Sequence, residues 1–138
     1  MFDYLIKNGQ LIDGTGSPAR RADVGITDGK IAAIGDLSAA QAGTVIDAAG
    51  KTVTPGFIDI HRHADAAIFR THFGELELKQ GLTTIVNGNC GLSVTPGSGP
   101  YRGEIEAYLS PVTGELPADA DCSSMQAYLD AARRQPSP

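Results

Sequence analysis

The chain has 138 residues and a formal net charge of −5 at pH 7, and its 11 basic residues form no long cluster. This balance gives no indication of a nucleic-acid groove or of binding to an anionic membrane surface. The 2 cysteines do not make a disulfide framework, and no apolar stretch approaches the roughly 18 residues that a membrane span needs. The N-terminus lacks the apolar core of a signal peptide, so we expect a cytoplasmic protein, and the sequence leaves its oligomeric state open.

Residues 1–54 are predicted to form short strands separated by turn residues. Asn8-Gly9 suits the left-handed positions of a tight turn and predicts a hairpin between the first two strands. Asp28-Gly29 predicts a second hairpin between the third and fourth. Several short strands with regular turns are typical of a small sandwich or barrel. The predicted strands are 4–7, 10–12, 22–27, 30–34, 44–47 and 51–54.

A strand–helix–strand unit follows Pro55-Gly56, which we take as a domain boundary. Phe57 to Ile60 is a nearly continuous apolar run, typical of a parallel strand that is covered on both faces. Phe73 to Gln80 is predicted to be helical, and Leu82 to Val86 is rich in β-branched residues and predicts the second strand. Such a unit predicts an α/β arrangement with a parallel sheet.

Residues 92–122 contain repeated prolines and glycines and are predicted to be a long loop on the side of the site. Ser123 to Arg134 is predicted to be the last helix. Its N-cap would be supplied by Ser123-Ser124. The predicted buried face of this helix comprises Met125, Tyr128, Leu129 and Ala132.

Three side chains near the two strand ends suggest a metal site. His61 and His63 are two positions apart, so on a strand they point to the same side. Cys90, a soft ligand, follows the second strand in a glycine-rich turn, and Asp65 adds a polar group that a plain core would not contain. Each feature has a simpler explanation, since His-x-His pairs are often surface residues and a lone cysteine is often a small buried one.

The chain resembles the amidohydrolase superfamily at these motifs. Residues 55–63 read Pro-Gly-Phe-Ile-Asp-Ile-His-Arg-His and are similar to the first-strand signature of that superfamily. Residues 80–84 look like the start of its second strand, and Gly88-Asn89-Cys90-Gly91 resembles the D-aminoacylase branch. The resemblance implies that residues 1–54 are the N-terminal part of a composite β-sandwich. Residues 55–138 would be the first two βα units of a metal-dependent (β/α)8 TIM barrel, truncated because a whole barrel needs about 250 residues.

The resemblance also implies a site. His61 and His63 would belong to one metal position and Cys90 to the other, which holds zinc more tightly in that family. Asp65 and Asn89 are candidates for contacts behind the ligands or with the substrate. The remaining histidines and the aspartate that acts as general acid/base in the family would lie beyond the chain end, so the catalytic residue is not assigned.

Three other residues lie outside the expected ligand set. Arg62 replaces the small polar residue usual between the histidines and should point away from the metal. His72 lies in no family motif and is expected to be structural or exposed. Cys122 is expected to be an incidental free thiol.

The resemblance implies that the complete protein is a zinc-dependent hydrolase of non-peptide carbon–nitrogen bonds that deacylates a small-molecule N-acyl-D-amino acid. The alternatives are a related amidohydrolase acting on cyclic amides and an inactive truncated product. We expect the 138 residues alone to be poorly active and to expose apolar strand surface that promotes association. The sequence does not specify the preferred D-amino acid.

Overall fold

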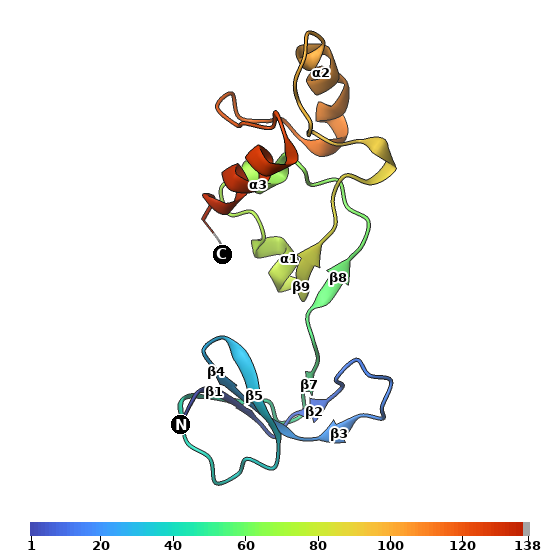
Figure 1. The fold of residues 1–138 in the computed structure, drawn as a ribbon. Coiled ribbons are helices and arrows are strands. Elements are labelled where there is room, and N and C mark those ends of the chain that lie inside the picture. Colours follow the sequence, from blue (N-terminus) through green and yellow to red (C-terminus); the bar gives the residue numbers. More distant parts are fainter. Residues whose placement is uncertain (137–138) are drawn as a thin grey trace. The chain divides into compact units, whose positions relative to one another are not determined.

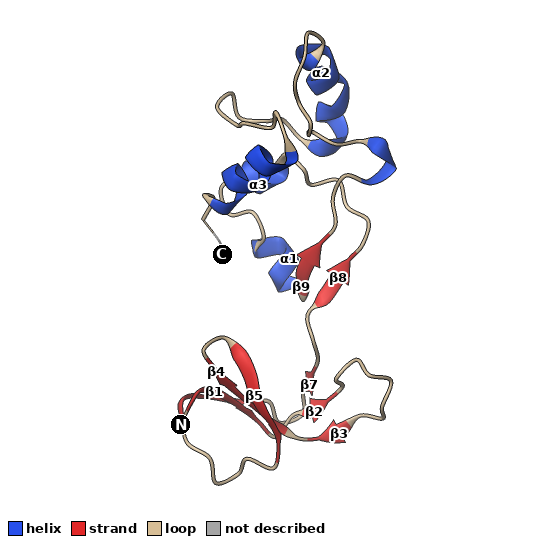
Figure 2. Ribbon diagram, in the orientation of Figure 1, coloured by secondary structure: helices blue, strands red, loops and turns tan. Residues whose placement is uncertain are grey.

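The computed structural model describes residues 1–136 and divides the chain into two compact units, Met1–Pro55 and Gly56–Pro138. Strands dominate the first unit and helices the second, as Figures 1 and 2 show. Within the described residues, no helix is long and apolar enough to cross a membrane.

The first unit contains two sheets that share a core. The four-stranded sheet has the order β5-β4-β1-β6, and the three-stranded sheet has the order β3-β2-β7. Buried Leu11 comes from the smaller sheet and buried Val24 from the larger one, and they belong to the same apolar cluster. The strands are β1 (Phe2–Lys7), β2 (Gln10–Leu11), β3 (Arg20–Arg21), β4 (Asp23–Thr27), β5 (Lys30–Gly35), β6 (Ala42–Asp47) and β7 (Thr52–Val53).

Of the two predicted hairpins, the structure confirms the second and shows that the first is wrong. β4 and β5 pair antiparallel around Asp28 and Gly29, whose φ angles are 51° and 69°. β1 instead pairs with β4 on one side and with β6 on the other. Both edges of β1 are therefore occupied, and β2 lies in the other sheet. Asn8, with φ 65°, forms a corner held by a hydrogen bond from its N–H to Asp23.

The second unit begins with the predicted strand–helix–strand arrangement. β8 (Phe57–Asp59) pairs parallel with β9 (Leu82–Ile85), and α1 (Glu75–Lys79) lies between them in the sequence. The two strands run side by side in Figure 1. A short 3-10 turn, η1 (Ala67–Phe69), precedes α1. The structure thus confirms this unit, while its continuation into a barrel remains a prediction.

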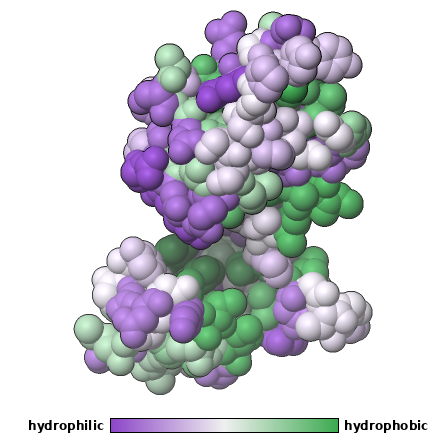
Figure 3. Space-filling view, turned by 45° about the horizontal axis from the view of Figure 1, so that its top comes forward, coloured by the Kyte–Doolittle hydropathy of each residue, from purple (hydrophilic) through white to green (hydrophobic). Residues whose placement is uncertain are grey.

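The apolar run at β8 is exposed within the described chain. Phe57, Ile58 and Ile60 retain 59%, 62% and 73% of their accessible surface. Hydrophobic surface of this kind, drawn green in Figure 3, is unusual for parallel strands, which are normally covered on both faces. The strand therefore presents surface that other polypeptide can cover.

The predicted loop 92–122 is wrong in part, because it contains the 12-residue helix α2 (Arg102–Thr113). Gly99 and Pro100 lie just before this helix, and Gly114, with φ 89°, ends it. Pro111 lies inside its last turn, where it cannot donate to a carbonyl four residues earlier. The hydroxyl of Ser110 donates to that carbonyl, on Ala107, at 3.3 Å. Gly99, Pro100 and Gly114 therefore lie at the helix boundaries, whereas Pro111 interrupts the hydrogen bonding of the last turn.

The last predicted helix is present as α3 (Met125–Arg133), and the Ser124 hydroxyl caps it by accepting the N–H of Ala127. The predicted face is only partly right, because Tyr128 is buried whereas Met125 and Leu129 are exposed. Its buried residues are Tyr128 and Ala131.

Cys122 is fully buried in the core of the second unit and is not incidental to packing. It remains a free thiol, as expected. It packs with Tyr128 of α3 and with Ala66, which follows the predicted histidine pair by three positions. The other buried members of this cluster are Val94 and Ala120.

Gly56 should resist substitution because β9 approaches it closely. A Cβ on Gly56 would lie 2.7 Å from Thr83 Cβ, and Thr83 is stiff at χ1. We expect Gly56→Ala to destabilise the chain by about 1–3 kcal/mol in urea unfolding. Gly103→Ala is the matched control: its Cβ would meet nothing within 4 Å, so a helical alanine there should be neutral or stabilising by up to about 1 kcal/mol. Equal unfolding midpoints for the two variants would contradict this reading.

Candidate metal centre

The site is built where two parallel strands end side by side. The pairing of β8 and β9 continues past both strands: the N–H of Val86 donates to the Asp59 carbonyl at 2.8 Å, and the N–H of Arg62 donates to the Val86 carbonyl at 3.1 Å. The residues after β8 and those after β9 are therefore held next to each other. This places the His-x-His segment beside the glycine-rich turn.

The candidate ligands His61, His63 and Cys90 meet at this point. Their ligand atoms all lie within 4.8 Å of one another, and Cys90 Sγ is 3.3 Å from His61 Nε2. The two imidazole rings stand edge to face, with centroids 5.4 Å apart. Cys90 has φ 58°, and left-handed Gly88 and Gly91 on either side of it make the turn that carries the thiol to the histidines.

These donors fit a zinc ion. Zinc binds imidazole nitrogen at about 2.0–2.1 Å and thiolate sulfur at about 2.3 Å, which puts two ligand atoms on one tetrahedral ion about 3.5 Å apart. At 3.3 Å, Cys90 Sγ and His61 Nε2 are close enough to bind one ion or two adjacent ions. Thiolate and imidazole also favour zinc over magnesium.

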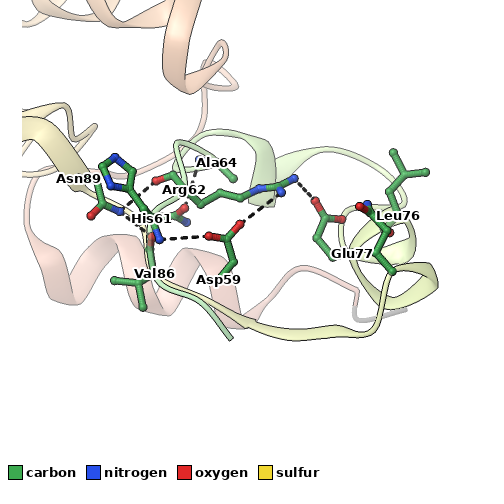
Figure 4. Close-up of polar contacts among 10 residues, drawn as sticks. Asp59, His61, Arg62, Ala64, Leu76, Glu77, Val86 and Asn89 are labelled. Atoms are coloured by element: carbon green, nitrogen blue, oxygen red, sulfur yellow. Dashed lines mark hydrogen bonds and ion pairs between the residues drawn. The ribbon is translucent and has the colours of Figure 1, made fainter. Parts of the chain in front are cut away.

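Asn89 joins the two ligand-bearing segments. Its side-chain Nδ2 donates to the Val86 carbonyl at 2.7 Å and to the Arg62 carbonyl at 3.3 Å (Figure 4). One amide therefore bridges the backbone after β9 and the residue between the two histidines.

Arg62 extends away from His61, toward α1. Its guanidinium lies 2.5 Å from Glu77 and 3.6 Å from Asp59, and Figure 4 shows the side chain running toward Glu77. The expectation that Arg62 points away from the histidines is confirmed. Its ion pair with Glu77 connects the histidine segment to α1, and its ion pair with Asp59 connects that segment to β8.

Two buried polar atoms of the site lack a hydrogen-bond partner among the described residues, His63 Nδ1 and Asp65 Oδ2. Asp65 is only 3% exposed, and burial raises the pKa of its carboxyl, although the Gly88 backbone N–H and His63 lower it in part. Such groups call for an explanation, because a buried polar atom without a partner is costly.

His72 lies outside the candidate site, and two residues that were not expected there, Asn87 and Tyr128, lie beside it. His72 is exposed, with its Nδ1 2.6 Å from Glu75, and lies outside the ligand cluster as expected. The sequence motifs did not place beside the site either Asn87, which accepts the N–H of Ala64, or Tyr128, which was expected only on the buried face of the last helix and donates to the Asp65 carbonyl. Asn87 could have been suspected from its place between a strand end and Gly88, but Tyr128 carried no such signal.

A model of the amidohydrolase family matches residues 44–132, well over half of the chain. The chain belongs to the amidohydrolase family. The N-acyl-D-glutamate deacylase of Alcaligenes xylosoxydans xylosoxydans is 46% identical over 131 residues, covering 95% of this chain and 26% of the relative. The D-aminoacylase of the same organism is 50% identical over 95 residues, covering 69% of this chain and 20% of the relative.

Solved structures agree with this family. The crystal structure of N-acyl-D-glutamate deacylase from Bordetella bronchiseptica, complexed with zinc and a phosphonate inhibitor, matches with a TM-score of 0.85 and 44% identity. The match covers 97% of this amidohydrolase chain and 27% of that structure. The fold is thus similar to the N-terminal part of D-aminoacylases, and the D-aminoacylase branch is supported. The chain spans about a quarter of the length of these relatives.

The two cysteines should differ sharply in reactivity. Cys90 is exposed, whereas Cys122 is buried and burial raises the pKa of its thiol. Because the thiolate is the nucleophile, iodoacetamide at pH 7.5 should label Cys90 and leave Cys122 intact in the native, metal-free chain. Peptide mass spectrometry measures both sites, and labelling in denaturant is the control in which both react. Preferential labelling of Cys122 in the native chain would contradict the structure.

Proposed function

We propose that this amidohydrolase chain carries the first zinc ligands of an N-acyl-D-amino-acid deacylase. The observation that supports this most strongly is the convergence of His61, His63 and Cys90 within 4.8 Å at the ends of adjacent parallel strands. The residues come from the two motifs that predicted a metal site, and they are the donor types that zinc prefers.

His61 and His63 hold one metal position in this proposal, and Cys90 belongs to the tighter one. His61 lies 3.3 Å from Cys90, so the two positions would be adjacent. The histidines and the cysteine would hold zinc, which would supply Lewis-acid polarisation of a carbonyl oxygen and a more acidic bound water. The chain's own residues contribute the donors, the turn that exposes the thiol and the hydrogen bonds that fix both segments.

Asp65 is proposed to orient His63. Both residues carry a buried atom without a partner among the described residues, and His63 acts electrostatically on the Asp65 carboxyl. Ligating histidines commonly donate their other ring N–H to a carboxylate, which fixes the ring and its tautomer. Pairing Nδ1–H of His63 with Oδ2 of Asp65 would satisfy both atoms. Asn89 supports the same segment through the backbone.

The proposed substrate is an N-acyl-D-amino acid, and the reaction is hydrolysis of its amide bond. The support comes from the names of the relatives, which are deacylases of that substrate class at 46% and 50% identity. No feature of the described residues favours a cyclic amide. Because the chain spans about a quarter of the relatives, the activity is proposed for a protein that contains this segment together with the rest of the domain.

Metal binding should depend on the three candidate ligands. In a complete protein that contains this segment, Cys90→Ala should reduce bound zinc most, at least tenfold at limiting zinc, because it removes the only thiolate of the cluster. His61→Ala and His63→Ala should act similarly to each other, with smaller effects on tightly bound zinc. Metal analysis after dialysis measures the content. His72→Ala is the matched control, since it removes an exposed histidine outside the cluster; unchanged zinc in Cys90→Ala would refute the assignment.

Activity is tested by placing this segment in a complete relative. The 131 matching residues should replace their counterparts in the Alcaligenes N-acyl-D-glutamate deacylase, because the two sequences are 46% identical there. We expect the chimera to release D-glutamate from N-acetyl-D-glutamate in a zinc-dependent manner and to ignore the L-enantiomer. Cys90→Ala in the chimera should lower kcat/KM by at least 100-fold. A folded, zinc-loaded chimera without activity would argue against the proposed function.

A further inference from the structure

The segment of residues 62–66, which contains His63, is held by backbone hydrogen bonds to several parts of the second unit. Its first carbonyl, on Arg62, accepts from Asn89. The N–H of Ala64 donates to Asn87 Oδ1 at 3.1 Å, and the N–H of Ala66 donates to the Thr113 carbonyl at 3.2 Å. These contacts come from α2, which contains Thr113, and from the residues after β9. Helix α3 supplies a further contact.

Tyr128 is the contact from α3. Its hydroxyl donates to the Asp65 carbonyl at 3.0 Å across 63 residues of sequence. Its ring is 9% exposed and stands edge to face with Phe69, with centroids 5.9 Å apart. Burial raises the pKa of Tyr128 to about 12, so the hydroxyl remains a donor at neutral pH. The ring of Tyr128 therefore packs in the core, while its hydroxyl makes a hydrogen bond that a substitution can remove without removing the ring.

Asn87 is the contact from the residues that follow β9. Asn87 holds Ala64, the residue directly after His63, while Tyr128 holds the carbonyl one residue further on. Together they restrain the backbone immediately C-terminal to the histidine.

We propose that Tyr128 and Asn87 are positioning residues for His63, restraining residues 63–66 so that the imidazole stays beside His61 and Cys90. The inference deepens the proposed function and rests on the metal centre described above. Neither side chain touches the metal position. Each acts through the backbone that carries the ligand, which is how supporting contacts hold a binding geometry. Removal of such supports commonly weakens metal binding by about 10–100-fold.

The test is Tyr128→Phe in the chimera with the Alcaligenes deacylase proposed above, freed of metal and titrated with Co²⁺ as a spectroscopic probe. Phenylalanine keeps the ring in the core and removes only the donor. We expect about tenfold weaker Co²⁺ binding and shifted d–d bands, with an unchanged far-UV circular dichroism spectrum. Tyr108→Phe is the matched control. It removes the same hydroxyl group from a tyrosine that is exposed on α2, away from residues 62–66.

A second variant and a metal-free measurement keep the test decisive. Asn87→Ala removes the acceptor for Ala64 from a half-buried position and should weaken Co²⁺ binding in the same way. Without metal, both variants should speed hydrogen exchange at the Ala64 amide relative to Tyr108→Phe. If Tyr128→Phe lost its circular dichroism signal, Asn87→Ala would decide the question.

The outcomes separate the two proposals. An unmutated chimera that binds Co²⁺, with affinity and bands unchanged in both Tyr128→Phe and Asn87→Ala, overturns the positioning role alone. A folded, unmutated chimera that binds no Co²⁺ overturns the metal centre, and the positioning role with it. Weakened binding in both variants, with Tyr108→Phe like the unmutated chimera, supports the positioning role.

Discussion

The candidate site depends on the parallel pairing of β8 with β9. Parallel strands end at the same edge of a sheet, so the residues after one strand lie next to those after the other. The backbone ladder continues through Val86 and Arg62, and this brings Cys90 to 3.3 Å from His61. An antiparallel arrangement would place the two motifs at opposite ends of the strands. The pairing brings the two segments together, and the hydrogen bonds of Asn87, Asn89 and Tyr128 then restrain their backbone.

Features that depend on local sequence were predictable. The strand–helix–strand unit follows from an apolar run, a helical stretch and a β-branched run in succession. The Asp28-Gly29 hairpin follows from two residues that adopt left-handed backbone readily. The proximity of the candidate ligands was predictable because His61 and His63 share a side of one strand and Cys90 follows the neighbouring strand.

Features that depend on contacts between residues far apart in the sequence were not predictable. Asn8-Gly9 has the same local chemistry as the second hairpin, but β1 is already paired on both edges, and only the sheet topology reveals this. Helix α2 was hidden because Pro111 reads as a breaker, whereas the Ser110 hydroxyl occupies the carbonyl that proline leaves free. Tyr128 reads as an ordinary core aromatic, and its hydrogen bond to Asp65 appears only when α3 packs on the ligand segment.

The separations of these contacts along the chain suggest an order of assembly. His61 and Cys90 are 29 residues apart, whereas Tyr128 reaches Asp65 across 63 residues. Closing the shorter loop costs less chain entropy, and near contacts tend to form sooner. On a ribosome, the donor cluster can gather while α3 is still unmade. The later helix would then restrain a donor cluster that has already formed, so that gathering the donors and restraining the segment after His63 would be separate steps of synthesis.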